Sequence, residues 1–255
     1  MQARGREWLP IRPCRLPSDP WHAAATGTTF EKDHPFPVPE PHVLVPLILV
    51  ALAGGGPTPA ASSSPALSMP ADTLTAIYRA GVSFQDFLGA AEARKVDWEA
   101  TWAGAGLDGA MVERALQAGE GWRILAVAED WCSDSVSSVP YIARLVEELP
   151  GVELRVVTSG PGAWVMEQYR SPDGRGTTPT VLLLDPSGAE VGCWIEQPSS
   201  LQEWWLAPPA PEETNRDRMQ RKMAWYAEDA GRQTVQEMVE MLEGAAAGSP
   251  VCPAH

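Results

Sequence analysis

The most constraining feature of the chain is an uninterrupted apolar run that ends in Trp-Cys and leads directly into an amphipathic segment. The run covers Ile124 to Ala128, and Trp131-Cys132-Ser133-Asp134-Ser135 follows it. A short, continuous apolar run is typical of a buried parallel strand. Residues 133–148 then repeat apolar side chains at helical spacing, which predicts a helix with one buried face. We therefore expect an α/β domain with Cys132 at the junction of a central strand and a helix.

Cys132 is a candidate reactive residue because of this junction. Unpaired backbone N–H groups and the helix dipole favour negative charge at a helix N-terminus, and the thiolate is the nucleophilic form of cysteine. The carboxylates of Glu129, Asp130 and Asp134 flank the sulfur and oppose a thiolate by like-charge repulsion. These two effects shift the pKa of Cys132 in opposite directions, and the sequence does not decide which is larger.

The second half of the expected core contains a hairpin preceded by a Thr-Pro pair. The apolar strands Thr180–Leu184 and Glu190–Ile195 flank Asp185-Pro186-Ser187-Gly188, which is a turn by composition. Thr178-Pro179 precedes the first strand, and X-Pro is the peptide bond that adopts the cis form at low cost. We expect one domain over residues 72–248, with a helical lead-in at 72–121, a core at 122–196 and C-terminal helices at 197–248.

Residues 1–71 lack the pattern of a folded domain. Proline is dense, and residues 54–69 are rich in Gly, Pro, Ala and Ser, which predicts a disordered extension. The apolar segment 43–53 is too short to span a bilayer as a helix, but it has the length of a signal-peptide core and ends in an Ala-x-Ala pattern. The stretch before it is acidic rather than basic. We therefore favour a cytoplasmic protein with an upstream extension, or a start at Met69, and keep export through 43–53 as the alternative.

The composition argues against several classes of function. With 19 basic and 33 acidic residues, the formal net charge is −14, so we expect no binding of nucleic acid or of an anionic membrane. Every histidine lies outside residues 72–248, which argues against His-dependent catalysis and most zinc sites in the expected domain. The cysteines lack metal-site spacing. We expect no metal, no cofactor and no membrane span; the sequence leaves the oligomeric state open, and we favour a monomer. The cysteines are Cys14, Cys132, Cys193 and Cys252.

Several local features together resemble the thioredoxin-like superfamily over about residues 122–196. Trp131 directly precedes the thiol, and Pro140 follows Cys132 by eight residues, where thioredoxins carry a kinking proline. Thr178-Pro179-Thr180 resembles their cis-proline loop. The acidic lead-in to the cysteine and the segment Trp225-Tyr226-Ala227-Glu228-Asp229 resemble an uncharacterised bacterial group of thioredoxin family proteins with a single-cysteine WCxDS motif. The resemblance implies a thioredoxin-like fold with helical additions at both ends.

The same resemblance implies a monothiol thiol–disulfide oxidoreductase that acts on protein or low-molecular-weight disulfides. Cys132 is the implied nucleophile, and Ser135 stands where the second cysteine of Cys-x-x-Cys would resolve a mixed disulfide. Trp131 and Thr178-Pro179 are the implied substrate contacts. Ala126 replaces the buried aspartate that shuttles protons in thioredoxins. The alternative is a non-catalytic module that binds an extended peptide in the same groove and keeps a vestigial thiol, so enzymatic activity stays an open question.

Cys193 is a candidate remote resolving cysteine. If Leu184 pairs with Ala189 across the expected turn, Cys193 lies opposite Thr180, beside the cis-proline loop. This register makes it the nearest other thiol to Cys132, although beyond the ~7 Å Cα separation that a disulfide tolerates. A one-residue error would turn Cys193 to the opposite face. The simpler interpretation of Cys193 is a small buried core residue.

Overall fold

The apolar runs of the sequence form a four-stranded mixed sheet. The computed structural model describes residues 71–249 and residue 252, so the expected N-terminal extension and the segment 43–53 lie outside the described residues. The strands are β1 (Arg123–Val127), β2 (Glu153–Val157), β3 (Thr180–Leu184) and β4 (Glu190–Ile195), in the order β2-β1-β3-β4. β1 is parallel to β2 and antiparallel to β3, and β3 is antiparallel to β4. This arrangement confirms the expected α/β fold class.

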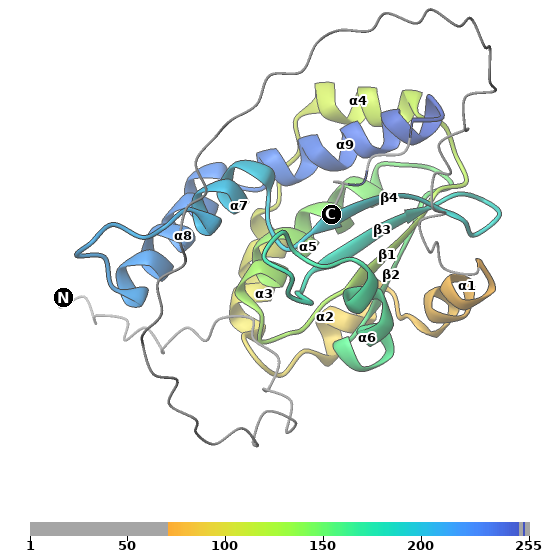
Figure 1. Cartoon of the computed structure of the whole chain (residues 1–255). Helices are drawn as coiled ribbons and strands as arrows, with labels where there is room; N and C mark the ends of the chain where they lie inside the picture. The colour runs from red at the N-terminus through yellow and green to blue at the C-terminus, as the bar shows by residue number, and fades with distance from the viewer. Residues whose placement is uncertain (1–70, 250–251, 253–255) are drawn as a thin grey trace, which may run out of the picture. The chain divides into compact units, whose positions relative to one another are not determined.

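Helices cover both faces of the sheet (Figure 1). Successive side chains of a strand point to opposite faces, and β1 follows this rule: Ile124 and Ala126 belong to one apolar cluster, Leu125 and Val127 to the other. The first cluster contains side chains of α5 (Ser133–Glu147) and α9 (Arg232–Ala246). The second contains side chains of α1 (Ala71–Ala80) and α6 (Ser159–Gln168).

Three helices of the lead-in support the strand–helix junction from the α5 side. They are α2 (Phe84–Ala90), α3 (Lys95–Gly104) and α4 (Gly109–Gln117). Trp98 of α3 is fully buried against the rings of Phe84 and Phe87. Its indole Nε1 donates a hydrogen bond to the backbone oxygen of Asp130 at 2.8 Å. The lead-in therefore fixes the chain just before Cys132.

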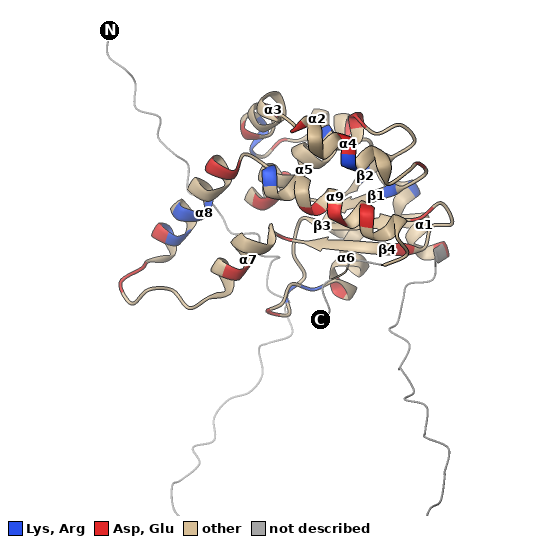
Figure 2. Ribbon diagram, turned by 90° about the horizontal axis from the view of Figure 1, so that it is seen from above, with Lys and Arg blue, Asp and Glu red and all other residues tan. Residues whose placement is uncertain are grey.

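The remaining helices, α7 (Ser199–Leu206) and α8 (Asn215–Asp229), form a helical pair between β4 and α9. We call them the α7–α8 hairpin. Figures 1 and 2 show the hairpin extending beyond one end of the sheet, with residues of both charge signs on α8. Gly231 ends it with φ +74°, and a Cβ there would collide with the ring of Tyr141, so glycine is required. None of the described helices has the length and apolar character needed to cross a membrane.

The register of the β3–β4 hairpin differs from the expected one. Leu184 pairs with Glu190, and an irregularity between Leu183 and Leu184 shifts the remaining pairs, so that Cys193 lies opposite Leu182. A bulge places two residues of one strand opposite one residue of the other. The predicted pairing of Cys193 with Thr180 is wrong by two residues: Leu184 pairs one residue later than expected, and the irregularity adds the second residue.

Cys193 forms a disulfide with Cys252, and the two Cα atoms are 4.7 Å apart. Cys193 is buried in the cluster that contains Leu125 and Leu182, on the face covered by α1 and α6. Helix α5, which begins next to Cys132, packs on the other face. The expected role of Cys193 as a resolving partner for Cys132 is thus displaced by a bond to the C-terminal segment.

Candidate functional site

Cys132 occupies the N-cap position of α5, as the sequence pattern predicts. Its backbone oxygen accepts the first helical hydrogen bond, from Val136 N at 3.0 Å. Its Sγ lies 3.1 Å from the backbone oxygen of Thr178. The Thr178–Pro179 peptide bond is cis, and all three residues are buried. The structure holds Cys132 as a disulfide cysteine, so thiol chemistry at this position requires its reduced form.

The Thr178-Pro179 loop is held by the two strands of the hairpin. Thr180 Oγ1 donates to the backbone oxygen of Thr177 at 2.7 Å. The backbone N–H of Glu196, directly after β4, donates to the oxygen of Pro179 at 2.8 Å. Trp131, which directly precedes Cys132 in the sequence, is half-buried. The structure thus brings Cys132 to Thr178 and Pro179, whereas Cys193 is bonded elsewhere.

Two of the acidic residues that flank Cys132 are satisfied by backbone N–H groups. Glu129 Oε1 accepts from Ser159 N, in the first turn of α6, at 2.8 Å. Asp130 Oδ2 accepts from the N–H groups of Glu92 and Ala93, both at 2.8 Å. Hydrogen bonds to a carboxylate disperse its charge, so these two groups oppose a thiolate less than the bare sequence suggests.

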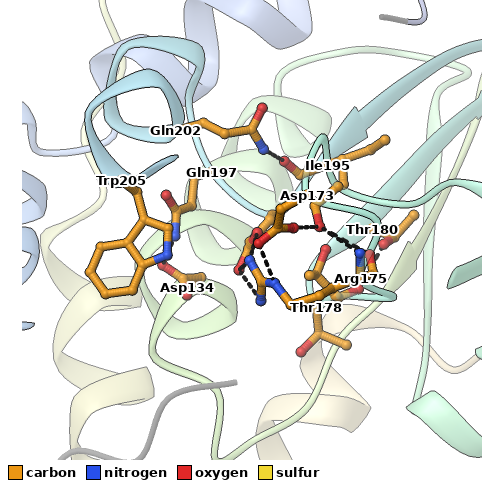
Figure 3. Close-up of polar contacts among 12 residues, drawn as sticks. Asp134, Asp173, Arg175, Thr178, Thr180, Ile195, Gln197, Gln202 and Trp205 are labelled. Atoms are coloured by element: carbon orange, nitrogen blue, oxygen red, sulfur yellow. Dashed lines mark hydrogen bonds and ion pairs between the residues drawn. The ribbon is translucent and has the colours of Figure 1, made fainter. Parts of the chain in front are cut away.

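The third flanking carboxylate, Asp134, is buried in the first turn of α5 and is held mainly by α8. Lys222 Nζ donates to Oδ2 at 2.8 Å, and Tyr226 OH donates to Oδ1 at 2.8 Å. Gln197 Nε2 lies 3.5 Å from Oδ1, and Figure 3 shows this amide and the Trp205 ring beside Asp134. Burial and the neighbouring Asp134 charge raise the pKa of Tyr226 well above its usual value. A buried carboxylate is tolerated here because it is paired and hydrogen-bonded.

A second buried carboxyl, Glu196, lies between this cluster and the Thr178-Pro179 loop. Burial, followed by the charge of Asp134, raises its pKa to about 7, against the opposing effect of Arg175. Arg175 Nη2 contacts Glu196 Oε2 at 3.2 Å, and its Nε donates to Asp173 Oδ2 at 2.6 Å (Figure 3). Glu196 also has a φ of +65°, a left-handed conformation that is uncommon outside glycine.

Ser135 lies one helical turn after Cys132, where N-cap and N3 side chains are neighbours. Its Oγ is buried and has no hydrogen-bond partner within the described residues. The same is true of Ser133 Oγ and Thr177 Oγ1, on the two segments that meet at the sulfur. A hydroxyl cannot form the second sulfur bond of a dithiol cycle, but it can donate a hydrogen bond to a thiolate.

The sequence alone did not identify the residues that contact the Cys132 motif from distant positions in the chain. Lys222 and Tyr226 stand four positions apart on α8, which places them on one helix face, and this spacing is the one local signal they give. Glu196 and Arg175 give no local signal. Within the described residues, no group of three or more His, Cys, Asp or Glu side chains is arranged to hold a metal ion.

Comparison with known proteins agrees with this architecture. A family model described as thioredoxin matches residues 81–217, more than half of the chain. A crystal structure of a protein of unknown function from Pseudomonas aeruginosa aligns with a TM-score of 0.53 and 21% identity, covering 66% of this chain and 96% of that one. An HIV epitope-scaffold aligns with a TM-score of 0.52 and 19% identity, covering 67% and 97%. No curated protein gives a significant match.

Proposed function

The chain belongs to the thioredoxin family, and on that premise we propose that it is a monothiol thiol–disulfide oxidoreductase with Cys132 as the attacking sulfur. The observation that carries the proposal is the 3.1 Å approach of Cys132 Sγ to the carbonyl that precedes cis-Pro179. It combines a cysteine at a helix N-terminus, which favours the thiolate, with the Thr178-Pro179 loop beside the sulfur.

The reaction is a pair of thiol–disulfide exchanges. The Cys132 thiolate attacks one sulfur of a protein or low-molecular-weight disulfide, forms a mixed disulfide and releases the other sulfur as a thiolate. A low-molecular-weight thiol, in its thiolate form, then attacks the substrate sulfur of the mixed disulfide, forms a new disulfide with it and releases the Cys132 thiolate. A second low-molecular-weight thiol reduces that new disulfide where the substrate is a protein disulfide, so the two electrons come from two external thiols, which end as their own disulfide. Ser135 takes no part in electron transfer, and its hydroxyl, which has no hydrogen-bond partner among residues 71–249, can donate a hydrogen bond to the thiolate.

The proposed site residues divide by role. Cys132 is the nucleophile, and Thr178 and Pro179 are the segment alongside which we expect an extended substrate to lie. Trp131 is proposed as a substrate contact at the edge of the site. The charged groups around Asp134 and Glu196 contribute to the electrostatic environment of the sulfur and do not themselves react.

The test is an exchange assay on reduced full-length protein. Glutathione disulfide is the oxidant, and the mixed disulfide at Cys132 is identified by peptide mass spectrometry, with the same protein unfolded in urea as the reference. We expect exchange at Cys132 in the folded protein to exceed that of the unfolded chain by about tenfold near neutral pH, because the thiolate fraction is larger. A rate no greater than that of the unfolded chain rejects the oxidoreductase and leaves the non-catalytic peptide-binding module.

A gain-of-function variant tests the monothiol assignment. Ser135→Cys supplies a resolving thiol one turn from Cys132, and we expect it to raise reduction of a protein disulfide in a dithiol-coupled assay. Ser135→Ala is the matched control, because it removes the hydroxyl without adding a thiol. A Ser135→Cys variant that reduces the protein disulfide no faster than the original chain counts against a competent exchange scaffold.

A further inference from the structure

The strongest unassigned feature of the molecule is the buried contact between the first turn of α5 and α8. Asp134, Lys222 and Tyr226 are 1%, 2% and 7% exposed, respectively. The two α8 side chains donate to different oxygens of the same carboxylate, each at 2.8 Å. Charged groups are rarely buried to this degree unless their pairing serves the structure or the chemistry.

The α7–α8 hairpin has its own internal support, so it presents these side chains in a defined position. Arg218 Nη2 donates to the backbone oxygens of Trp204, Trp205 and Ala207, at the end of α7. Lys222 Nζ lies 4.7 Å from the centre of the Trp205 ring. One turn of α8 separates Lys222 from Tyr226, so both reach Asp134 from the same helix face.

The electrostatic consequence concerns the sulfur two residues before Asp134. An uncompensated carboxylate in the first turn would oppose a thiolate at the N-cap. The Lys222 ammonium balances that charge, and the Tyr226 hydroxyl disperses it. Of the other charged groups near the motif, Glu129 and Asp130 accept backbone N–H groups. Glu196 pairs with Arg175. Its pKa is raised by burial and by the charge of Asp134 and lowered by the charges of Arg175 and Lys222, so it belongs to the same charge cluster.

We propose that Lys222 and Tyr226 are positioning residues for Cys132, which act by holding the Asp134 carboxylate in a charge-balanced, hydrogen-bonded state so that the α5 N-terminus favours the thiolate. The reactivity of the sulfur is thereby tied to a helix 90 or so positions further along the chain, since the contacts span 88 and 92 residues. The inference deepens the proposed function, because it takes Cys132 as the reacting sulfur.

The test measures the alkylation rate of reduced Cys132 from about pH 5 to about pH 9 and takes the midpoint of the profile. We expect Lys222→Met to raise the midpoint by about one pH unit and Asp134→Asn to lower it by a similar amount. The double variant should return close to the original value, because its charge balance is restored. Arg221→Met is the matched control: it removes a positive charge from the same helix, but Arg221 is paired with Glu213 and should leave the midpoint unchanged.

A second pair of variants keeps the test decisive if the single charge deletions unfold. Tyr226→Phe removes one hydroxyl, and we expect a smaller upward shift of the midpoint that disappears in the Asp134→Asn background. A Tyr226→Phe shift of equal size in both backgrounds, or no shift in either, overturns the proposal. So does a Lys222→Met midpoint equal to that of the original protein.

The exchange assay separates this inference from the proposed function. Midpoints that move as expected, without exchange with glutathione disulfide, support the positioning role and reject the oxidoreductase. Exchange at Cys132 with midpoints that do not respond to Lys222 or Asp134 supports the oxidoreductase and overturns the positioning role.

Discussion

Cys132 and Cys193 are both buried cysteines at the sheet, yet their surroundings have opposite character. Cys132, which is also a disulfide cysteine in the structure, ends a strand–helix junction next to the Thr178 carbonyl. Cys193 lies inside β4, in a cluster of apolar side chains, and is bonded to Cys252. An apolar environment disfavours a thiolate, whereas a helix N-terminus favours it.

Position within an element, more than burial, assigns chemistry to a sulfur in this chain. A residue in the middle of a strand has its backbone groups paired by the neighbouring strands, so it adds packing or a crosslink. A residue at a helix N-cap faces backbone N–H groups that have no partner inside the helix. We therefore expect function at Cys132 and stability at Cys193, and the following experiments are ordered by the size of the effect that separates the two.

The largest effect is expected from removing the Cys132 sulfur. Cys132→Ser should lower exchange with glutathione disulfide by at least about 100-fold, because a serine hydroxyl is not ionised at neutral pH. The matched variant is Cys193→Ser combined with Cys252→Ser, which should keep exchange at Cys132 within about twofold, since Cys193 packs in the apolar cluster with α1 and α6, whereas α5 packs in the other cluster. Equal losses in both variants would erase the functional distinction between the two cysteines.

The next largest effect concerns stability, and here we expect the larger loss at Cys193 and the smaller loss at Cys132. Removing the Cys193–Cys252 bond frees a loop with a sequence separation of 59 residues in the unfolded chain. By the loop-entropy argument, the double serine variant should lose about 2–4 kcal/mol of unfolding free energy in urea titrations. Cys132→Ser should lose less unfolding free energy, relative to the original protein, when both proteins are measured in the reduced form. A larger loss at Cys132 would assign it the structural role.

The core of this fold could be predicted from the sequence because its signals are local. The apolar run at 124–128, the helical spacing at 133–148 and the turn at Asp185 to Gly188 each depend on neighbouring residues. The junction at Cys132 and the Thr178-Pro179 pair follow from these elements. What local signals could not supply was the bulge next to Leu184, which depends on packing between strands rather than on turn composition.

The long-range part of the site could not be predicted for a related reason. Lys222 and Tyr226 meet Asp134 across 88 and 92 residues, and a single sequence contains no pairing information at such separations. In isolation, Asp134 predicts only repulsion of a thiolate, and the structure supplies the donors that offset it. The Cys193–Cys252 bond was missed in the same way, because Cys252 lies beyond the last helix.

A smaller effect tests whether the polar Cys132 region is pH-sensitive while the apolar Cys193 region is not. The pKa of Glu196 in the folded protein is about 7, above its usual 4.5, mainly because of burial. Between these values the folded state binds more protons than the unfolded state, so unfolding free energy falls as pH rises through the window. Glu196→Gln should reduce the stability difference between about pH 5 and about pH 8 by about 2 kcal/mol in urea titrations.

The control for Glu196 is Glu203→Gln, on the exposed surface of α7, which should keep the pH dependence of the original protein. An unchanged pH dependence in Glu196→Gln would mean that the carboxyl near the Thr178-Pro179 loop is solvated in solution. The Cys132 region would then differ from the Cys193 region in composition but not in the pH dependence of its stability.

The smallest effect separates the stability of α8 from its influence on the sulfur. Thr214 caps α8: its Oγ1 accepts from Asp217 N at 3.2 Å and lies 2.6 Å from Asp217 Oδ2. Thr214→Ala should lower the unfolding free energy by about 1 kcal/mol, and Thr214→Ser should restore most of it. The midpoint of the Cys132 alkylation profile should not move in either variant, because fraying of the first turn leaves Lys222 and Tyr226 on the intact part of the helix. A midpoint shift as large as that of Lys222→Met would instead attribute the effect on Cys132 to loosening of α8, and not to the charge that α8 places on Asp134.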